Sequence, residues 1–230
     1  MGQLMGRLIG TNQATIRQRT DYTNVHLNDR DMKRHVLITG GATVAFVELL
    51  LEVSTPQFLS ALQAHGITHL DIQCATYVDE IEKRFQEMDP DDEYDLSGLS
   101  VRVFDFEVSL KRRMQQLCRG EEGVQLAGFV IGHAGTGTIA DSFETDVALV
   151  VVANPNLMHD HQTPFAAVIT KEHKNLIHGH LGRLVETIPK ALDLIEQNGL
   201  DHLEPMVEET LPLGEGEGVY FVDQVIAHSL

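Results

Sequence analysis

Short apolar runs alternate along the chain with segments of helical spacing. The apolar runs lie at 35–39, 68–74, 99–106, 126–132 and 147–155. Between and after them, helices are expected at 44–53, 55–66, 107–120, 138–146, 161–173 and within 181–199. Strands that are apolar on both faces and alternate with helices are typical of a parallel sheet. The pattern therefore predicts an α/β fold, a Rossmann-like parallel sheet with helices on both faces.

The ends of one helix are marked in the sequence. Thr55 has the residue type of an N-cap, Pro56 suits the first helical position, and Gly66 suits the stop. The segment between them carries apolar residues at helical spacing, so we expect a helix there.

Three parts are expected along the chain. Residues 1–34 carry six Lys or Arg against three Asp, which predicts a flexible arm. Residues 35–213 hold the α/β domain. An acidic insertion near 79–99, in which residues 79–95 contain nine acids, is expected to be exposed and extended. Residues 214–230 begin with the linker "GEGEG" and end in the amphipathic stretch "VYFVDQVIAHSL".

The charge and cysteine content exclude some classes of protein. A net charge of -17 argues against nucleic-acid binding, which depends on Lys and Arg. Two cysteines are too few for a disulfide framework and favour a reducing compartment. No stretch of the sequence approaches the apolar length of a membrane span, so we expect no transmembrane segment of the chain's own.

The stretch "FVIGHAGTGTIAD", residues 129–141, is the strongest candidate for a binding site. A strand ends near His133, Gly135 and Gly137 follow, and a helix is expected to begin near Thr138. A glycine-rich turn into a helix presents unpaired backbone N–H groups and the positive end of the helix dipole. The two glycines would keep side chains away from that backbone, and Thr136 and Thr138 would add hydroxyl donors. We therefore expect an anion site, suited to a diphosphate.

Three nucleotide-binding interpretations compete for this motif. A P-loop requires a lysine that the chain lacks between Arg119 and Lys171. The dinucleotide pattern is met by Gly135, Gly137 and Ala140, but Asn154 stands where an acidic ribose ligand should end the next strand. The third interpretation uses more residues, because the chain also fits H-x-G-x-x-S/T-x-x-D/E, with a His-Gln pair 21 residues later: His133, Gly135, Thr138, Asp141, His161 and Gln162.

That third pattern resembles the donor-binding half of GT-B glycosyltransferases. "HVLITGGAT", "SLK", "IGHAGTGT", "LVVVANPNLMHDHQ", "LPLG" and "FVDQV" together resemble the catalytic subunit of the transferase that adds the second N-acetylglucosamine to the dolichol-diphosphate precursor of N-glycosylation, related to glycosyltransferase family 28. The resemblance runs from about residue 36 to the end. It implies a fold equivalent to the C-terminal half of a GT-B enzyme, and an inverting transferase split over two chains.

The resemblance also implies roles for individual residues. UDP-N-acetylglucosamine would be the donor, with the diphosphate on the loop 135–138, ribose at Asp141, where the family usually has Glu, and the sugar at His161 and Gln162. His133 would contact the departing phosphate and assist catalysis. The loop that faces the acceptor would contain Gly40, Gly41 and Thr43. No cofactor and no metal are expected; the pairs His159–His161 and His178–His180 are weak evidence for zinc.

Partners follow from the same resemblance. A membrane-anchored subunit would supply the acceptor half, bind the dolichol-linked N-acetylglucosamine diphosphate and recruit this otherwise cytoplasmic chain to the cytosolic face of the endoplasmic reticulum. The C-terminal stretch would dock on that subunit, and the chain alone would be inactive. A nicotinamide-dependent oxidoreductase and a non-catalytic nucleotide-sugar-binding subunit stay open as alternatives.

Phe104 and Phe106 are expected in the core.

Overall fold

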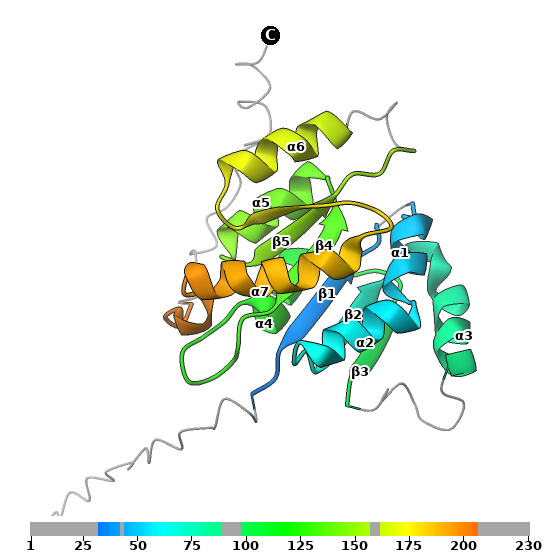
Figure 1. Cartoon of the computed structure of the whole chain (residues 1–230), viewed down its shortest axis with the longest axis horizontal. Coiled ribbons are helices and arrows are strands. Elements are labelled where there is room, and N and C mark those ends of the chain that lie inside the picture. Colours follow the sequence, from blue (N-terminus) through cyan, green and yellow to red (C-terminus); the bar gives the residue numbers. More distant parts are fainter. Residues whose placement is uncertain (1–31, 42–43, 89–97, 157–161, 207–230) are drawn as a thin grey trace, which may run out of the picture.

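The structure, a computed structural model, describes residues 32–41, 44–88, 98–156 and 162–206. Strands and helices alternate along this part of the chain (Figure 1). The strands are β1 His35–Thr39, β2 His69–Gln73, β3 Ser100–Phe104, β4 Phe129–His133, β5 Ala148–Val152 and β6 Leu176–Gly179. The helices are α1 Val47–Val53, α2 Pro56–Ala64, α3 Val78–Met88, α4 Leu110–Cys118, α5 Thr136–Glu144, α6 Gln162–Glu172 and α7 Thr187–Gln197.

The six strands described form one sheet in the order β3-β2-β1-β4-β5-β6, and every neighbouring pair is parallel. Their carboxyl ends therefore share one edge. Thr39 at the end of β1 is in register with Gln73 of β2 and with Gly132 of β4. The order of the strands reverses between β1 and β4, and ligands of open parallel sheets bind beyond the carboxyl ends at such a point.

Helices cover both faces of the sheet, as the sequence predicts (Figure 1). Apolar side chains of α1, α2, α3 and α7 pack in one buried cluster with alternate residues of the strands, such as Val36 and Ile38. Side chains of α4, α5 and α6 pack with the intervening residues, such as Leu37 and Val130, in a second cluster. Because strand residues alternate between faces, a central strand of this kind must be apolar throughout. The predicted α/β fold is confirmed.

The capping prediction for α2 is confirmed. Thr55 adopts extended backbone angles, its hydroxyl accepts a hydrogen bond from the N–H of Phe58 at 3.3 Å, and Pro56 occupies the first helical position. The N–H of a first-position residue has no partner within the helix, so proline loses nothing there.

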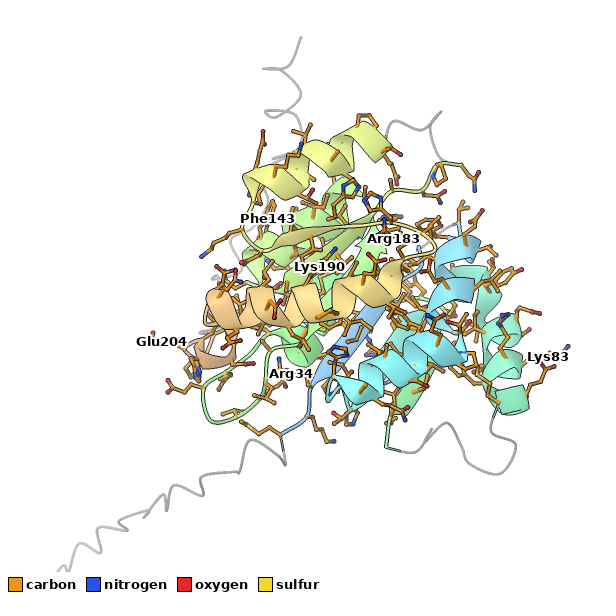
Figure 2. The ribbon with its side chains drawn as sticks, viewed as in Figure 1. Arg34, Lys83, Phe143, Arg183, Lys190 and Glu204 are labelled. Atoms are coloured by element: carbon orange, nitrogen blue, oxygen red, sulfur yellow. The ribbon has the colours of Figure 1, made fainter. Side chains whose placement is uncertain are left out.

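The prediction of an extended acidic segment is wrong for residues 79–88. These residues belong to α3, which buries Ile81 and Phe85 against the first apolar cluster. The charged side chains lie on the outer side of the helix, as Lys83 does in Figure 2. Two large apolar residues four positions apart meet the core together, and that burial outweighs repulsion between exposed, solvent-screened acids. Residues 89–97 lie outside the described part.

Four smaller differences from the predicted elements and core are found. Helix α1 begins at Val47 instead of residue 44, and α5 begins at Thr136, two residues earlier than expected. Strand β6 was not predicted, because its four residues, "LIHG", contain a histidine and show no alternation. Phe106 is 56% exposed, so it does not pack in the core.

The boundary of the N-terminal arm lies before Arg34. The backbone N–H of Arg34 donates to the hydroxyl of Thr68 at 3.1 Å, and its guanidinium lies 3.2 Å from the carboxylate of Asp201. Residues 1–31 of the predicted arm and the predicted C-terminal docking helix lie outside the described residues. Among the helices that the structure describes, none combines the length and the apolar character needed to cross a bilayer.

Candidate functional site

Helix α5 begins with an open amino terminus. Gly135 is its N-cap, with extended angles (φ -88°, ψ 136°), and no side chain in the described part caps the helix. The first backbone N–H groups of an α-helix have no partner within the helix. Thr136 and Gly137, the first two helical residues, are exposed. The expected anion-binding geometry is therefore present at this position.

The two glycines of the motif have different reasons to be glycine. A Cβ on Gly135 would overlap the imidazole ring of His133, so Gly135 makes room for a side chain of the protein itself. A Cβ on Gly137 would have no heavy atom within 4 Å. No neighbour among the described residues therefore requires glycine at position 137, and its bare backbone leaves space for a ligand against the helix terminus.

A small cavity of about 100 Å³, lined by both polar and apolar groups, lies beside this helix terminus, at the carboxyl ends of β1, β2 and β4. Three of the predicted site residues line it together: Gly41, His133 and Thr138. Its other lining residues have no predicted role and are Thr39, Gln73, Glu107 and Leu110. The cavity occupies the point where strand order reverses, so the β1 loop and the glycine motif, predicted as separate parts of the site, adjoin each other.

Among the residues that the structure describes, two polar atoms at this cavity are buried without a hydrogen-bond partner. They are Oγ1 of Thr39 and Nδ1 of His133. An unpaired buried polar atom costs about 1–3 kcal/mol of folding free energy, and such atoms are uncommon. Both lie among the residues that would surround a ligand at α5.

Asp141 lies three residues after Thr138 on α5 and is half-buried. Burial raises the pKa of its carboxyl group, as does the neighbouring Glu144, while Lys111 opposes them. Lys111 itself forms an ion pair with Glu144. The placement one helical turn beyond Thr138 is compatible with contact to a ligand that extends from the helix terminus.

Gln162, the first residue of α6, is fixed from the end of β5. Its Oε1 accepts a hydrogen bond from the N–H of Asn154 at 3.0 Å, which turns the Nε2 end of the amide away from that backbone. The side chain of Asn154 accepts from the N–H of Asn156, whose own amide donates to Glu48 of α1 at 2.7 Å. Asn154 is thus engaged in shaping a turn. His161 and Thr43 lie outside the described residues.

Gly40 continues β1 and is closely packed. Its N–H donates to the carbonyl of Gln73 at 2.9 Å, and a Cβ at this position would overlap that carbonyl and the side chain of Leu50. Gly41 has a φ of +102°, a conformation that glycine adopts readily. Gly40 is therefore glycine because the close packing leaves no room for a side chain, and Gly41 turns the chain toward the cavity.

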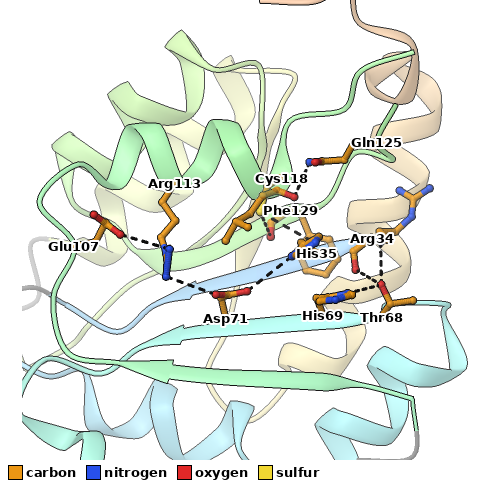
Figure 3. Close-up of polar contacts among 11 residues, drawn as sticks. Arg34, His35, Thr68, His69, Asp71, Glu107, Arg113, Cys118, Gln125 and Phe129 are labelled. Carbon is orange, nitrogen blue, oxygen red and sulfur yellow. Dashed lines mark hydrogen bonds and ion pairs between the residues drawn. The ribbon is translucent and has the colours of Figure 1, made fainter. Parts of the chain in front are cut away.

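A cluster of charged groups lies under α4 and reaches the cavity at Glu107 (Figure 3). Buried Asp71 of β2 lies 3.8 Å from the ring of His35 and 3.8 Å from the guanidinium of Arg113. Arg113 also lies 3.5 Å from Glu107 and stacks over the ring of Phe104 at 4.4 Å. The arginine thereby links the middle of the sheet to the wall of the cavity.

The structure offers little support for zinc. The rings of His178 and His180 lie 4.2 Å apart, and burial and His180 lower the pKa of His178. Among the residues that the structure describes, no three His, Cys, Asp or Glu side chains gather in a way that could hold a metal ion. His159 and His161 lie outside that part, so metal independence stays a prediction.

Comparisons with known proteins agree with the geometry. Residues 35–216 match the Glycosyltransferase family 28 C-terminal domain. UDP-N-acetylglucosamine transferase subunit ALG13 of Saccharomyces cerevisiae is 31% identical over 152 residues, which cover 58% of this chain and 72% of that protein. The Candida glabrata protein of the same name is 29% identical over 215 residues, which cover 84% of this chain and 98% of that protein.

A solved structure is similar as well. The NMR solution structure of ALG13 matches with a TM-score of 0.51 and 26% sequence identity, over 76% of this chain and 90% of that chain. The match covers most of the described α/β domain. Sequence and structure therefore agree on one assignment: the chain belongs to glycosyltransferase family 28, through the C-terminal domain of that family.

Proposed function

We propose that this chain is the donor-binding, catalytic subunit of a two-chain glycosyltransferase. It moves N-acetylglucosamine from UDP-N-acetylglucosamine to N-acetylglucosaminyl-diphosphodolichol, giving the chitobiosyl lipid used in N-glycosylation. The acceptor hydroxyl attacks the anomeric carbon with inversion, the bond from that carbon to the diphosphate oxygen breaks, and UDP leaves. Family membership and the names of the relatives support a UDP-N-acetylglucosamine transferase subunit.

One observation carries the proposal. The uncapped amino terminus of α5 opens beside Gly137, where no described residue fills the space, and beside the cavity at the strand reversal. A diphosphate seated there would receive the backbone N–H groups of the first helical turn and the favourable end of the helix dipole. The same groups would offset the negative charge that grows on UDP as the glycosidic bond breaks, so no divalent metal is required in this scheme.

The remaining residues take their roles around this centre. His133 contacts the departing phosphate, Asp141 binds ribose hydroxyls, and Gln162 presents its amide to the sugar together with His161. The loop of Gly40, Gly41 and Thr43 faces the acceptor. Proton removal from the acceptor hydroxyl falls to a base on the partner chain or near the Gly40–Gly41 turn.

The partner is a membrane-anchored subunit that binds the dolichol-linked acceptor and closes the cleft. It recruits the chain from the cytoplasm to the cytosolic face of the endoplasmic reticulum. The word "subunit" in the names of the relatives supports an assembly of this kind. A chain that holds only the donor half lacks an acceptor site, so it should show no turnover alone.

The alternative functions fit less well. A dinucleotide-binding protein places an acidic residue at the end of the strand after the glycine motif, to bind ribose. This chain has Asn154 there, and its side-chain oxygen is engaged with the N–H of Asn156. A non-catalytic nucleotide-sugar sensor would bind UDP as the transferase does, and only a transfer assay separates the two.

Replacement of Gly137 by Asp tests the binding site. The new carboxylate has room, and an acid in the first turn of a helix favours the helix, so thermal stability should not fall. It would repel a diphosphate, and we expect UDP affinity measured by calorimetry to drop by more than about tenfold. Gln57→Asp places the same charge in the first turn of α2, away from the cavity, and should leave UDP affinity unchanged. Unchanged affinity in Gly137→Asp would overturn the site.

The transfer reaction is tested with the partner present. Membranes that contain both subunits should convert a GlcNAc-diphosphate lipid and UDP-N-acetylglucosamine to the chitobiosyl lipid, whereas the chain alone should not. UDP binding without transfer in the assembled complex would favour the sensor. Binding of NAD, with no response to UDP, would favour the oxidoreductase.

A further inference from the structure

We propose that Thr39 is an additional ligand-binding residue of the donor site, and that its hydroxyl donates a hydrogen bond to an oxygen of the bound diphosphate. This inference rests on the proposed function and adds a contact from β1 to those of the glycine motif. Thr39 is the last residue of β1, is 2% exposed, and lines the cavity beside α5.

The hydroxyl of Thr39 is unusual among the buried hydroxyl groups described. Its Oγ1 has no hydrogen-bond partner in the described part of the chain. By contrast, four other buried hydroxyl groups donate to backbone carbonyls three or four residues earlier: those of Ser54, Ser142, Thr145 and Thr187. Valine has the same shape and is at least as suitable for a strand. An unpaired threonine here therefore lowers stability without improving the packing of the fold.

The surrounding residues leave space for this side chain. Gly132 lies opposite Thr39 in the register of β1 and β4, and a Cβ on Gly132 would overlap the Thr39 hydroxyl. The same Cβ would lie 3.3 Å from the methyl carbon of Thr138. Because Oγ1 has no partner, rotation about one bond can turn it toward a ligand without breaking an existing hydrogen bond.

The ligand group that fits this position is an oxyanion. The cavity of about 100 Å³ equals roughly three times the volume of one water molecule, about 30 Å³, enough for a few small polar groups. One side of it is the amino-terminal turn of α5, which favours negative charge, and Thr39 adds a donor from the sheet side. Glu107 brings a carboxylate to the same wall, but the guanidinium of Arg113, 3.5 Å away, offsets its charge. A phosphate of the donor is thus contacted by two elements, the amino-terminal turn of α5 and the end of β1.

The test compares stability with UDP affinity in the full chain. Thr39→Val removes the hydroxyl and keeps the shape, so the melting temperature without ligand should stay equal or rise, while the Kd for UDP rises about tenfold. Thr39→Ser keeps the hydroxyl and should bind UDP within about twofold of the unmodified chain. The matched control is Thr145→Val, which removes a buried hydroxyl that has a partner; it should lower the melting temperature and leave the UDP affinity unchanged.

The outcomes separate this inference from the proposed function. If the unmodified chain binds UDP and Thr39→Val binds it equally well, Thr39 is not a ligand contact and only this inference is overturned. Thr39→Ala is a second hydroxyl-free variant, and equal UDP affinity in it would have the same consequence. If the unmodified chain does not bind UDP, both the inference and the proposed donor site are overturned.

Discussion

Thr39 and Gly132 oppose each other across the β1–β4 pair, and the space for the threonine hydroxyl exists because residue 132 has no side chain. This contact lies at the reversal of strand order, directly under the cavity. Gly132 has no positive φ, so steric room is its reason for being glycine.

Gly132→Ala should therefore destabilise the fold. The added methyl group would overlap Thr39, and overpacking of this kind costs about 1–3 kcal/mol. Urea unfolding followed by circular dichroism measures the loss. Gly137→Ala is the matched control, because its methyl group meets nothing within 4 Å and should leave stability equal or slightly higher. Equal stability of both variants would contradict the packing described.

Asp141→Asn should stabilise the chain at neutral pH. Burial and Glu144 raise the pKa of Asp141 in the folded state, so the ionised carboxyl is less favourable there than in the unfolded chain. The stability linked to its protonated form is present below the unfolded pKa of 3.8 and is lost as pH rises through the raised folded pKa. Melting curves of both proteins from pH 3.5 to 7 should diverge as pH increases. A constant difference would contradict the shift.

The same substitution should weaken the binding of UDP if Asp141 binds ribose, because the amide is neutral and has one acceptor oxygen where the carboxylate has two. Calorimetry with UDP at pH 7 measures this. A variant that is more stable and binds UDP more weakly would identify Asp141 as a residue retained for its ligand.

The charged cluster under α4 should be cooperative. Asp71→Asn leaves Arg113 without its buried partner, and we expect a loss of about 2–3 kcal/mol in unfolding free energy. Arg113→Met removes the other charge. Unfolding experiments on both single variants and the double variant should yield a coupling of about 1 kcal/mol. Additive effects would show that the two side chains do not interact.

Both cysteines should resist alkylation in the native protein. Burial, with a contribution from Glu82, raises the pKa of Cys74 to about 12, and burial and Asp71 raise the pKa of Cys118. Thiolate is the reactive form, so native protein at pH 8 should react slowly with iodoacetamide and rapidly after unfolding. Mass spectrometry counts the modified thiols. Fast labelling of either cysteine in the folded state would contradict its burial.

Several features of the fold were predictable because each depends on local sequence. Thr55 and Pro56 mark the start of α2, and the apolar runs mark the five longer strands. The prediction for residues 79–88 is wrong because it rests on the many acids in this segment. Ile81 and Phe85 are four residues apart, and that spacing is the sequence signal for α3. Strand β6 is too short to show a period.

The candidate site was predictable only in part. The glycine motif can be recognised in the sequence. That Gly135 makes room for the ring of His133 whereas Gly137 does not becomes visible only in the structure. Thr39 is the polar last residue of the apolar run 35–39, and Gln73 is a polar residue one position before the end of the run 68–74. Their common cavity depends on the order β2-β1-β4, which spacing along the chain does not determine.

The hydrogen bond of Arg34 to Thr68 and its ion pair with Asp201 matter for attaching the protein to a surface. Both contacts lie where β1 begins, whereas the cavity lies where β1 ends. Five strand residues separate the two by about 16 Å. A surface tether attached just before Arg34 should therefore leave nucleotide binding unobstructed, so the chain can be immobilised through this end for binding measurements.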